Sequence, residues 1–199
     1  LLLDIGNTHT RASLSTRGRV GKVLEFSTDK WSSARTLQKI VGKHNPTGTA
    51  CCSVVPAATK LAKALCPAPF STLTHANCGV DLRYPKPATI GPDRLANARA
   101  ALDEFGGPVL VVDFGTAVTF DIIDGSGAYV GGVIAPGLSA MTDYLHEKTA
   151  LLPAIRLKDH QTAIGKTTVQ AMQIGAVHGY RGLVQGLIKE IRQSLGTKR

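Results

Sequence analysis

Leu1-Leu2-Leu3-Asp4-Ile5-Gly6-Asn7-Thr8 begins the chain, and Leu110-Val111-Val112-Asp113-Phe114-Gly115-Thr116 repeats its pattern in the second half. In each stretch an apolar run is broken by Asp, and Gly and a small polar residue follow. A shift of 109 positions lays Asp4 on Asp113 and Gly6 on Gly115. The repeat predicts two related domains, each with an Asp-x-Gly turn. Because such turns suit a metal-bound nucleotide phosphate chain, the first hypothesis is a phosphotransferase.

The composition is typical of a soluble globular protein. The 199 residues are enough for one large domain or two small ones, and 43% are hydrophobic and 19% charged. No apolar stretch approaches the roughly 20 residues that a membrane helix needs. The net charge of +9 comes from scattered Lys and Arg, and only 5% of the residues are aromatic. This pattern favours a basic surface that attracts anionic metabolites over a nucleic-acid interface.

The four cysteines are Cys51, Cys52, Cys66 and Cys78. They lack the C-x-x-C spacing of a zinc site, and no His pair completes one. We therefore expect reduced, mostly buried thiols, which are typical of a cytoplasmic protein.

Both halves follow the same order of strand, Asp-Gly turn, hairpin strands and helices. Hydrophobic periodicity predicts strands over 1–4, 11–15, 20–26, 49–55, 70–74, 109–113, 118–123 and 128–134, helices over 31–41, 57–65, 95–105, 139–148 and 165–195, and an extended loop over 81–90. Gly106-Gly107-Pro108 ends a helix, so the domains are expected over residues 1–106 and 107–199. The order predicts an α/β protein in which helices cover mixed sheets.

The first Asp-x-Gly turn is a candidate phosphate loop. Gly6-Asn7-Thr8 is expected to present backbone N–H groups to phosphate oxygens, and Thr8 and Thr10 would add hydroxyl donors. Asp4 could hold the Mg²⁺ that accompanies ATP. The alternative for a single copy is an Asp that caps a tight turn, but two copies at equivalent places favour the functional interpretation.

Gly91-Pro92-Asp93-Arg94 is the second constellation. Asp93 stands before a helical run, where it could be an N-cap or a general base that accepts the proton of an attacking hydroxyl. The local sequence alone favours the cap. Arg94 could bind a carboxylate or a phosphate through two nitrogen atoms.

Two further motifs resemble known catalytic loops without their context. Asp113-Phe114-Gly115 matches a protein-kinase triplet, but no catalytic-loop His-Arg-Asp precedes it. Gly165-Lys166-Thr167-Thr168 matches the end of a Walker A loop, but His160 occupies the position where that loop needs its first Gly. Both interpretations are rejected.

Six motifs follow one another along nearly the whole chain: Asp4-Ile5-Gly6-Asn7-Thr8, Tyr84 with Pro87, Gly91-Pro92-Asp93-Arg94, Asp113-Phe114-Gly115-Thr116, Gly131-Gly132-Val133-Ile134-Ala135-Pro136-Gly137-Leu138, and Gly165-Lys166-Thr167-Thr168. In this order they resemble the motifs of type III pantothenate kinases, which catalyse the first committed step of coenzyme A synthesis. The resemblance implies two duplicated actin-like ATPase (ribonuclease H-like) domains. It also implies transfer of the ATP γ-phosphate to pantothenate.

The same resemblance implies roles for individual residues. Asp93 would be the catalytic base, and Asp113 would bind the monovalent cation, K⁺ or NH₄⁺, that the family requires. ATP with Mg²⁺ would be bound by Asp4, Ile5, Gly6, Asn7, Thr8, His9, Thr10, Arg11 and Thr116. Pantothenate would be bound by Tyr84, Gly91, Pro92, Asp93, Arg94 and Thr168. A cytoplasmic homodimer with a shared active site is implied as well, with neither nucleic acid nor a membrane as a partner.

The chain departs from the family pattern in two places. Pro92 replaces a small residue, which a helix start tolerates. Family members continue beyond the last helix into a strand and a glycine-rich turn, so the second domain is expected to be shortened at its C-terminus. This supports an alternative, a catalytically weakened relative that binds a metabolite or regulates. A sugar or acetyl kinase is a weaker alternative, because Tyr84 and the Gly91–Arg94 turn speak against it.

Overall fold

A computed structural model describes residues 1–16, 18–29 and 44–196. The helix predicted over 31–41 lies outside these residues. The chain forms two compact units. The first contains Leu1–Val112 and Thr119–Val133, and the second contains Asp113–Val118 and Ile134–Arg199. The predicted division between residues 106 and 107 stays a prediction.

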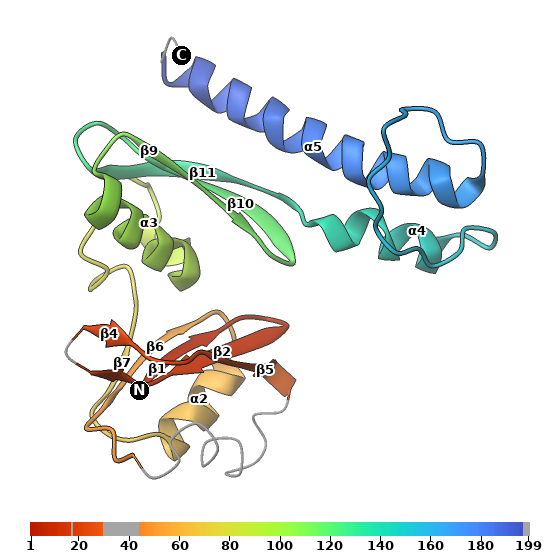
Figure 1. Ribbon diagram of the computed structural model, residues 1–199. Coiled ribbons are helices and arrows are strands. Elements are labelled where there is room, and N and C mark those ends of the chain that lie inside the picture. The colour runs from red at the N-terminus through yellow and green to blue at the C-terminus, as the bar shows by residue number, and fades with distance from the viewer. Residues whose placement is uncertain (17, 30–43, 197–199) are drawn as a thin grey trace. The chain divides into compact units, whose positions relative to one another are not determined.

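A five-stranded mixed sheet lies in the first unit (Figure 1). Its strands are β1 (Leu2–Ile5), β2 (His9–Ser13), β5 (Leu24–Ser27), β6 (Thr49–Ser53) and β7 (Phe70–Thr72), in the order β5-β2-β1-β6-β7. β1 runs antiparallel to β2 and parallel to β6, and Asp4 faces Arg11 on one side and Cys52 on the other. A short hairpin, β3 (Ser15–Thr16) with β4 (Arg19–Val20), follows β2.

The core of this sheet follows from the alternation along β1. Leu3 and Ile5 are buried while Asp4, between them, is exposed, because successive side chains of a strand point to opposite faces. The buried side chains pack with Ala58 and Ala62 of α2 (Pro56–Leu65). Helix α2 therefore covers one face of the sheet, and Asp4 belongs to the other.

A second sheet has the order β8-β11-β10-β9, formed by β8 (Asp81–Leu82), β9 (Val109–Phe114), β10 (Ala117–Ile123) and β11 (Ala128–Pro136). Its buried core joins Ile123 and Tyr129 to Leu95 and Ala98 of α3 (Pro92–Phe105). The loop predicted over 81–90 is wrong in part. It contains β8, which pairs in parallel with β11, and the 3₁₀ turn η2 (Pro87–Thr89).

The second unit is mostly helical. It contains the 3₁₀ turn η3 (Leu138–Met141), α4 (Asp143–Lys148) and the long helix α5 (Thr168–Ser194). The single helix predicted over 139–148 is thus two elements. Helix α5 begins at Thr168 rather than near Gly165, because the Thr167 side chain accepts a hydrogen bond from the Gln170 N–H and caps the helix.

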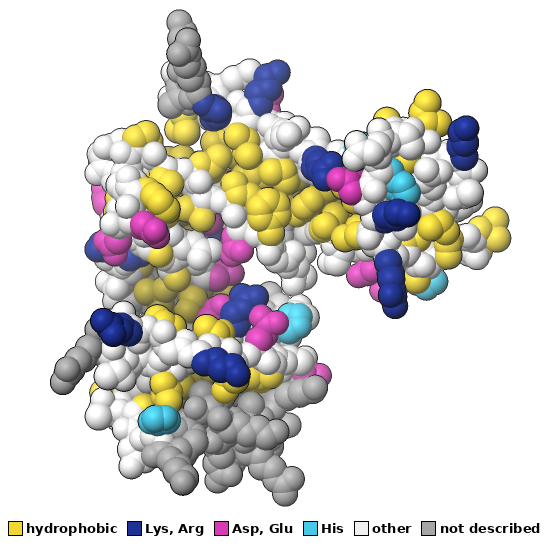
Figure 2. Space-filling view, viewed as in Figure 1, with side chains coloured by type: hydrophobic (Ala, Val, Ile, Leu, Met, Phe, Trp, Pro, Cys, Tyr) yellow, Lys and Arg dark blue, Asp and Glu magenta, His cyan; other side chains and the backbone are white. Residues whose placement is uncertain are grey.

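The predicted fold class is confirmed at the level of an α/β protein whose mixed sheets are flanked by helices. On the face shown in Figure 2, Lys and Arg side chains stand singly among acidic and polar ones. Within the described part of the chain, no helix has both the length and the apolar character needed to span a bilayer.

Candidate active site

The first Asp-x-Gly turn joins β1 to β2, and its own hydrogen bonds hold it together. The Gly6 N–H donates to the His9 carbonyl at 2.9 Å, and the Thr28 hydroxyl donates to the Gly6 carbonyl at 2.7 Å. In this conformation the Gly6 N–H is therefore already paired within the turn, and its contact with phosphate stays a prediction. The Thr10 side chain is fully buried, with its hydroxyl 3.0 Å from the Thr28 hydroxyl, so its predicted role as a donor to phosphate gains no support here.

The exposed face of the first sheet carries a row of charges across three strands. The Arg11 guanidinium lies 2.8 Å from the Glu25 carboxylate and 3.7 Å from the Asp4 carboxylate. About half of the Asp4 side chain is accessible, with a relative accessibility of 51%. An accessible carboxylate beside a glycine turn fits the magnesium ion of a nucleotide, since hard cations take oxygen ligands.

A hollow of ≈ 480 Å³ opens on this sheet. Asp4, Arg11 and Cys52 are among its lining residues, together with apolar side chains such as Val20 and Val23. Its charged residues, Asp4 and Arg11, come from the charged row, and Ser13, Ser71 and Asn77 add neutral polar groups.

The Cys52 thiol links Asp4 to Asp93. Burial raises the pKa of Cys52 to about 12, and the negative charges of Asp4 and Asp93 act in the same direction. The charges of both carboxylates thus oppose the ionisation of one half-buried thiol. Asp4 is the register partner of Cys52 on β6, and α3, which carries Asp93 in its first turn, contacts the same strand.

Asp93 stands in the first turn of α3, but it is not the N-cap. Gly91 is the cap residue and Pro92 the first helical residue, so the N-cap interpretation of Asp93 is wrong. The Asp93 carboxylate accepts the Arg94 N–H at 2.9 Å, and its charge is favourable at a helix start. A Cβ at position 91 would overlap the Asp93 Oδ1 atom, so Gly91 makes room for this carboxylate.

Arg94 binds an internal carboxylate. Its Nε and Nη2 atoms each lie 2.7 Å from Oδ1 of Asp121, which is fully buried on β10. The Tyr129 hydroxyl donates to the same oxygen at 2.8 Å, and the Tyr129 ring meets Tyr84 edge-on with centroids 6.2 Å apart. The first unit thus gathers Tyr84 and the Gly91–Arg94 turn around one buried network.

The second Asp-x-Gly turn joins β9 to β10 and belongs to the second unit. The Gly115 N–H donates to the Ala117 carbonyl at 3.0 Å, much as Gly6 does in the first turn. Asp113 and Thr116 are exposed. The Gly137 N–H donates to the Thr116 carbonyl at 3.1 Å, and a Cβ at Gly137 would overlap the Gly115 and Thr116 carbonyl oxygens. A carboxylate with nearby carbonyl oxygens is a donor set that fits a hard cation.

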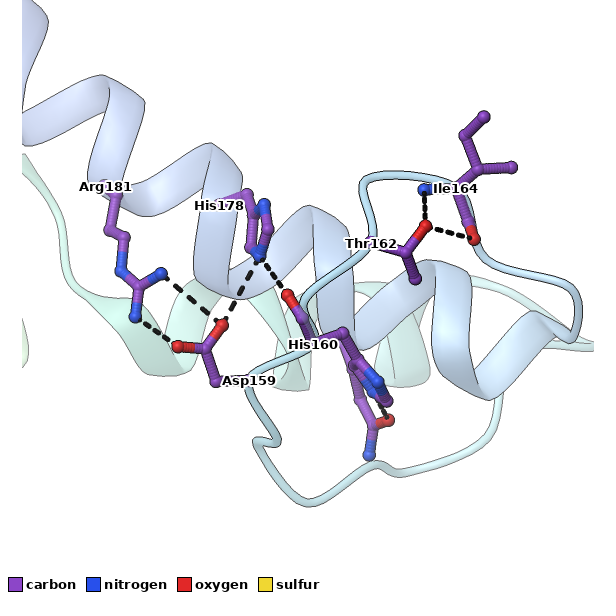
Figure 3. Close-up of polar contacts among 7 residues, drawn as sticks. Asp159, His160, Thr162, Ile164, His178 and Arg181 are labelled. Atoms are coloured by element: carbon purple, nitrogen blue, oxygen red, sulfur yellow. Dashed lines mark hydrogen bonds and ion pairs between the residues drawn. The ribbon is translucent and has the colours of Figure 1, made fainter.

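Thr168 is exposed at the start of α5. Side chains of α5 hold the loop that contains Asp159 and His160 (Figure 3). The Arg181 Nη2 atom lies 2.6 Å from the Asp159 carboxylate, and His178 Nε2 lies 3.0 Å from the His160 carbonyl oxygen. The Arg181 hydrogen bonds, followed by those of His178, hold the pKa of Asp159 below its ordinary value.

Sequence reasoning missed Asp121, Tyr129 and the cap at Thr167. A signal for Asp121 was available, since a lone carboxylate inside the apolar run Ala117–Ile123 needs an internal partner. Thr167 and Gln170 have the spacing of a capping box, and this spacing indicates a helix start at Thr168.

Comparison with known proteins identifies the family to which these residues belong. The sequence pattern of the type III pantothenate kinases matches residues 1–190. The chain belongs to the type III pantothenate kinase family. A type III pantothenate kinase of Methylacidiphilum infernorum is 42% identical over 197 residues, which are 98% of this chain and 72% of that protein. One of Akkermansia muciniphila is 42% identical over 199 residues, covering 100% of this chain and 82% of that protein.

A solved structure supports the fold of this pantothenate kinase family member. It is a Campylobacter jejuni protein described as a Baf family transcriptional activator, with a TM-score of 0.61 and 22% identity over 94% of this chain and 78% of that one. At that identity the likeness concerns the fold alone. The family predicted from the six motifs is confirmed, and the weakened relative is not favoured.

Proposed function

We propose that this chain transfers the γ-phosphate of ATP to the primary hydroxyl of pantothenate and so forms 4′-phosphopantothenate, the first step of coenzyme A synthesis. The observation that carries the proposal is that Asp4 and Asp93 lie on elements that meet at β6: Asp4 pairs in register with Cys52, and the helix that begins with Asp93 in its first turn contacts this strand. Many kinases use one carboxylate to hold the Mg²⁺ of the nucleotide and another to accept the proton of the attacking hydroxyl.

Asp93 is the proposed base. Its carboxylate is half-buried at the start of α3, fixed by the Arg94 N–H, and would accept the proton of the pantothenate hydroxyl. Tyr84, Gly91, Pro92 and Arg94 would hold pantothenate beside it, with Thr168 as a further contact.

The segment Asp4–Arg11 with Thr116 is the proposed ATP site. Since Gly6 and Thr10 use their polar groups within the turn, contacts to phosphate are left to Asn7, Thr8, His9 and Arg11, which are exposed. Mg²⁺ bound with ATP would neutralise phosphate charge, with Asp4 as its protein ligand. Asp113 would hold a monovalent cation, K⁺ or NH₄⁺.

The two Asp-x-Gly turns follow equivalent strands, β1 and β9, and each glycine N–H closes its own turn, which supports two duplicated actin-like domains. A homodimer with a shared active site is supported by four exposed glycines along α5, at positions 175, 179, 182 and 186, around which a Cβ would meet open space. The free cysteines support a cytoplasmic location.

The test is a coupled assay of ADP release with ATP, Mg²⁺ and pantothenate, with K⁺, NH₄⁺ or Na⁺ as the monovalent cation. We expect turnover that requires pantothenate and is highest with K⁺ or NH₄⁺. Asp93→Asn should lower kcat by about a hundredfold or more, within the range for loss of a general base, while calorimetry still shows pantothenate binding. Absence of turnover with every cation, with binding retained, would instead identify a metabolite-binding relative.

A further inference from the structure

Asp121 is a carboxylate in a buried environment, which disfavours its charged form. It lies on β10 with a fully buried side chain, and its neighbours along the strand include Phe120, Ile122 and Ile123. A buried charge without a partner is costly, so such a residue needs compensating donors. Burial raises the pKa of Asp121, and the hydrogen bond from Arg94 acts in the opposite direction.

The compensation is concentrated on one oxygen atom. Oδ1 of Asp121 lies 2.7 Å from both Nε and Nη2 of Arg94, and it accepts a hydrogen bond from the Tyr129 hydroxyl at 2.8 Å. Among the described residues, Oδ2 has one long contact, 3.5 Å, with the Thr119 hydroxyl. The Arg94 side chain is itself 13% exposed. Two nitrogen atoms of the Arg94 guanidinium therefore bind the same buried oxygen atom.

Arg94 connects Asp121 to Asp93, the proposed base. Its side chain is fixed by Asp121, while its backbone N–H donates to the Asp93 carboxylate at 2.9 Å. A Cβ at Gly132 would overlap the Arg94 Nη2 atom and the Phe120 carbonyl oxygen, so the path of the guanidinium depends on that glycine. The Tyr129 ring extends the same network to Tyr84.

We propose that Asp121 is a positioning residue, which holds Arg94 with the help of Tyr129 and thereby fixes the first turn of α3 and the orientation of Asp93. The inference rests on the proposed function, in which Asp93 is the base. Asp121 is fully buried and does not touch substrate; it acts through Arg94. The network predicts that loss of the Asp121 charge lowers the rate of the chemical step more than it weakens the binding of ATP.

The experiment compares Asp121→Asn with wild type in the pantothenate-dependent assay, with KM for ATP and thermal melting measured on the same preparations. We expect kcat to fall by at least about tenfold, because small displacements of a reacting group cost up to about a hundredfold. KM for ATP should stay within about twofold, since Asp121 makes no contact with the charged row around Asp4.

Tyr129→Phe is the second variant, since it removes one hydrogen bond from Asp121 and keeps the ring. It should lower kcat by about threefold or more, with KM for ATP unchanged, and it decides the matter if Asp121→Asn fails to fold. Asp103→Asn is the matched control, because it breaks an exposed pair with Arg99 on the same helix and should leave kcat unchanged.

The outcomes separate this inference from the proposed function. A wild-type chain without turnover contradicts the proposed function itself. An active wild type together with a folded Asp121→Asn variant of unchanged kcat overturns the positioning role. Unchanged kcat in Tyr129→Phe when Asp121→Asn does not fold, or an equal loss in Asp103→Asn, overturns it as well.

Discussion

Asp4 of β1 and Cys52 of β6 are register partners on neighbouring parallel strands, and the negative charge of the carboxylate helps to keep the thiol protonated. Asp93 acts on the same thiol. The reactivity of the Cys52 thiol should therefore respond to both proposed functional carboxylates, and it can be measured in the absence of substrates.

Asp4→Asn or Asp93→Asn should make Cys52 react faster with iodoacetamide at pH 8. With a pKa of about 12 the thiolate is scarce, and removal of either charge lowers that pKa, so we expect an increase of about two- to tenfold. Peptide mass spectrometry measures the rate. Cys66 is the internal control, because burial raises its pKa to about 11 without a contribution from either carboxylate. An unchanged ratio of Cys52 to Cys66 labelling would contradict the assignment.

Gly137→Ala should destabilise the turn that carries Asp113. The new Cβ would overlap two backbone carbonyl oxygens, of Gly115 and Thr116, which cannot move as a flexible side chain can. We expect a loss of about 2 kcal/mol or more in the free energy of unfolding, measured by urea titration. Gly125→Ala is the control, since a Cβ there meets no atom within 4 Å. Equal stability of the two variants would show that the turn can relax.

Asp159→Asn should make the free energy of unfolding depend less on pH in the acid range. In wild type the folded-state pKa of Asp159 is held below its ordinary value of 3.8 by Arg181 and His178. Such a group stabilises the fold above pH 3.8, and that contribution is lost as pH falls through the lower folded-state pKa. Urea midpoints between pH 7 and pH 3 should therefore converge between wild type and variant at the acid end. Glu190→Gln, an exposed acid on α5, serves as control. A constant difference at every pH would rule out this linkage.

Gly179→Leu should weaken self-association without harming the fold of one subunit. A side chain at Gly179 meets no atom of its own chain within 4 Å, and Leu is the better helix former. A loss of dimer would therefore indicate that the new side chain clashes with a second copy of the chain. Light scattering after size exclusion should show a dimer for wild type and monomer for the variant. Lys60→Leu on α2 adds the same side chain elsewhere and should leave the dimer intact. A dimeric Gly179→Leu protein would place the interface away from this stripe.

Local sequence patterns predicted the elements better than the interactions between them. The strands that carry Asp4 and Asp113 could be read from apolar runs that end in an Asp-x-Gly turn, and both lie where expected. Helix α3 begins three residues before the predicted start at Leu95, because Pro92 can occupy the first helical position and moves the cap from Asp93 to Gly91.

The positions of side chains in the site could not be read from local patterns. Gly6 and Thr10 looked like free donors, but their partners, His9 and Thr28, are set by the return of the chain in β2 and the residues after β5. Asp121 lies 27 residues from Arg94, so only the packing of α3 on β10 reveals their pairing. Such long-range pairs depend on tertiary structure rather than on periodicity.

The raised pKa values of Cys51, Cys52 and Cys66 bear on oxidative stress. Peroxides attack the thiolate and hardly react with the protonated thiol. Burial raises the pKa of Cys51 and Cys66 to about 11, and that of Cys52 to about 12. During a burst of hydrogen peroxide these three thiols would thus stay chemically unchanged while more acidic thiols elsewhere in the cell are consumed.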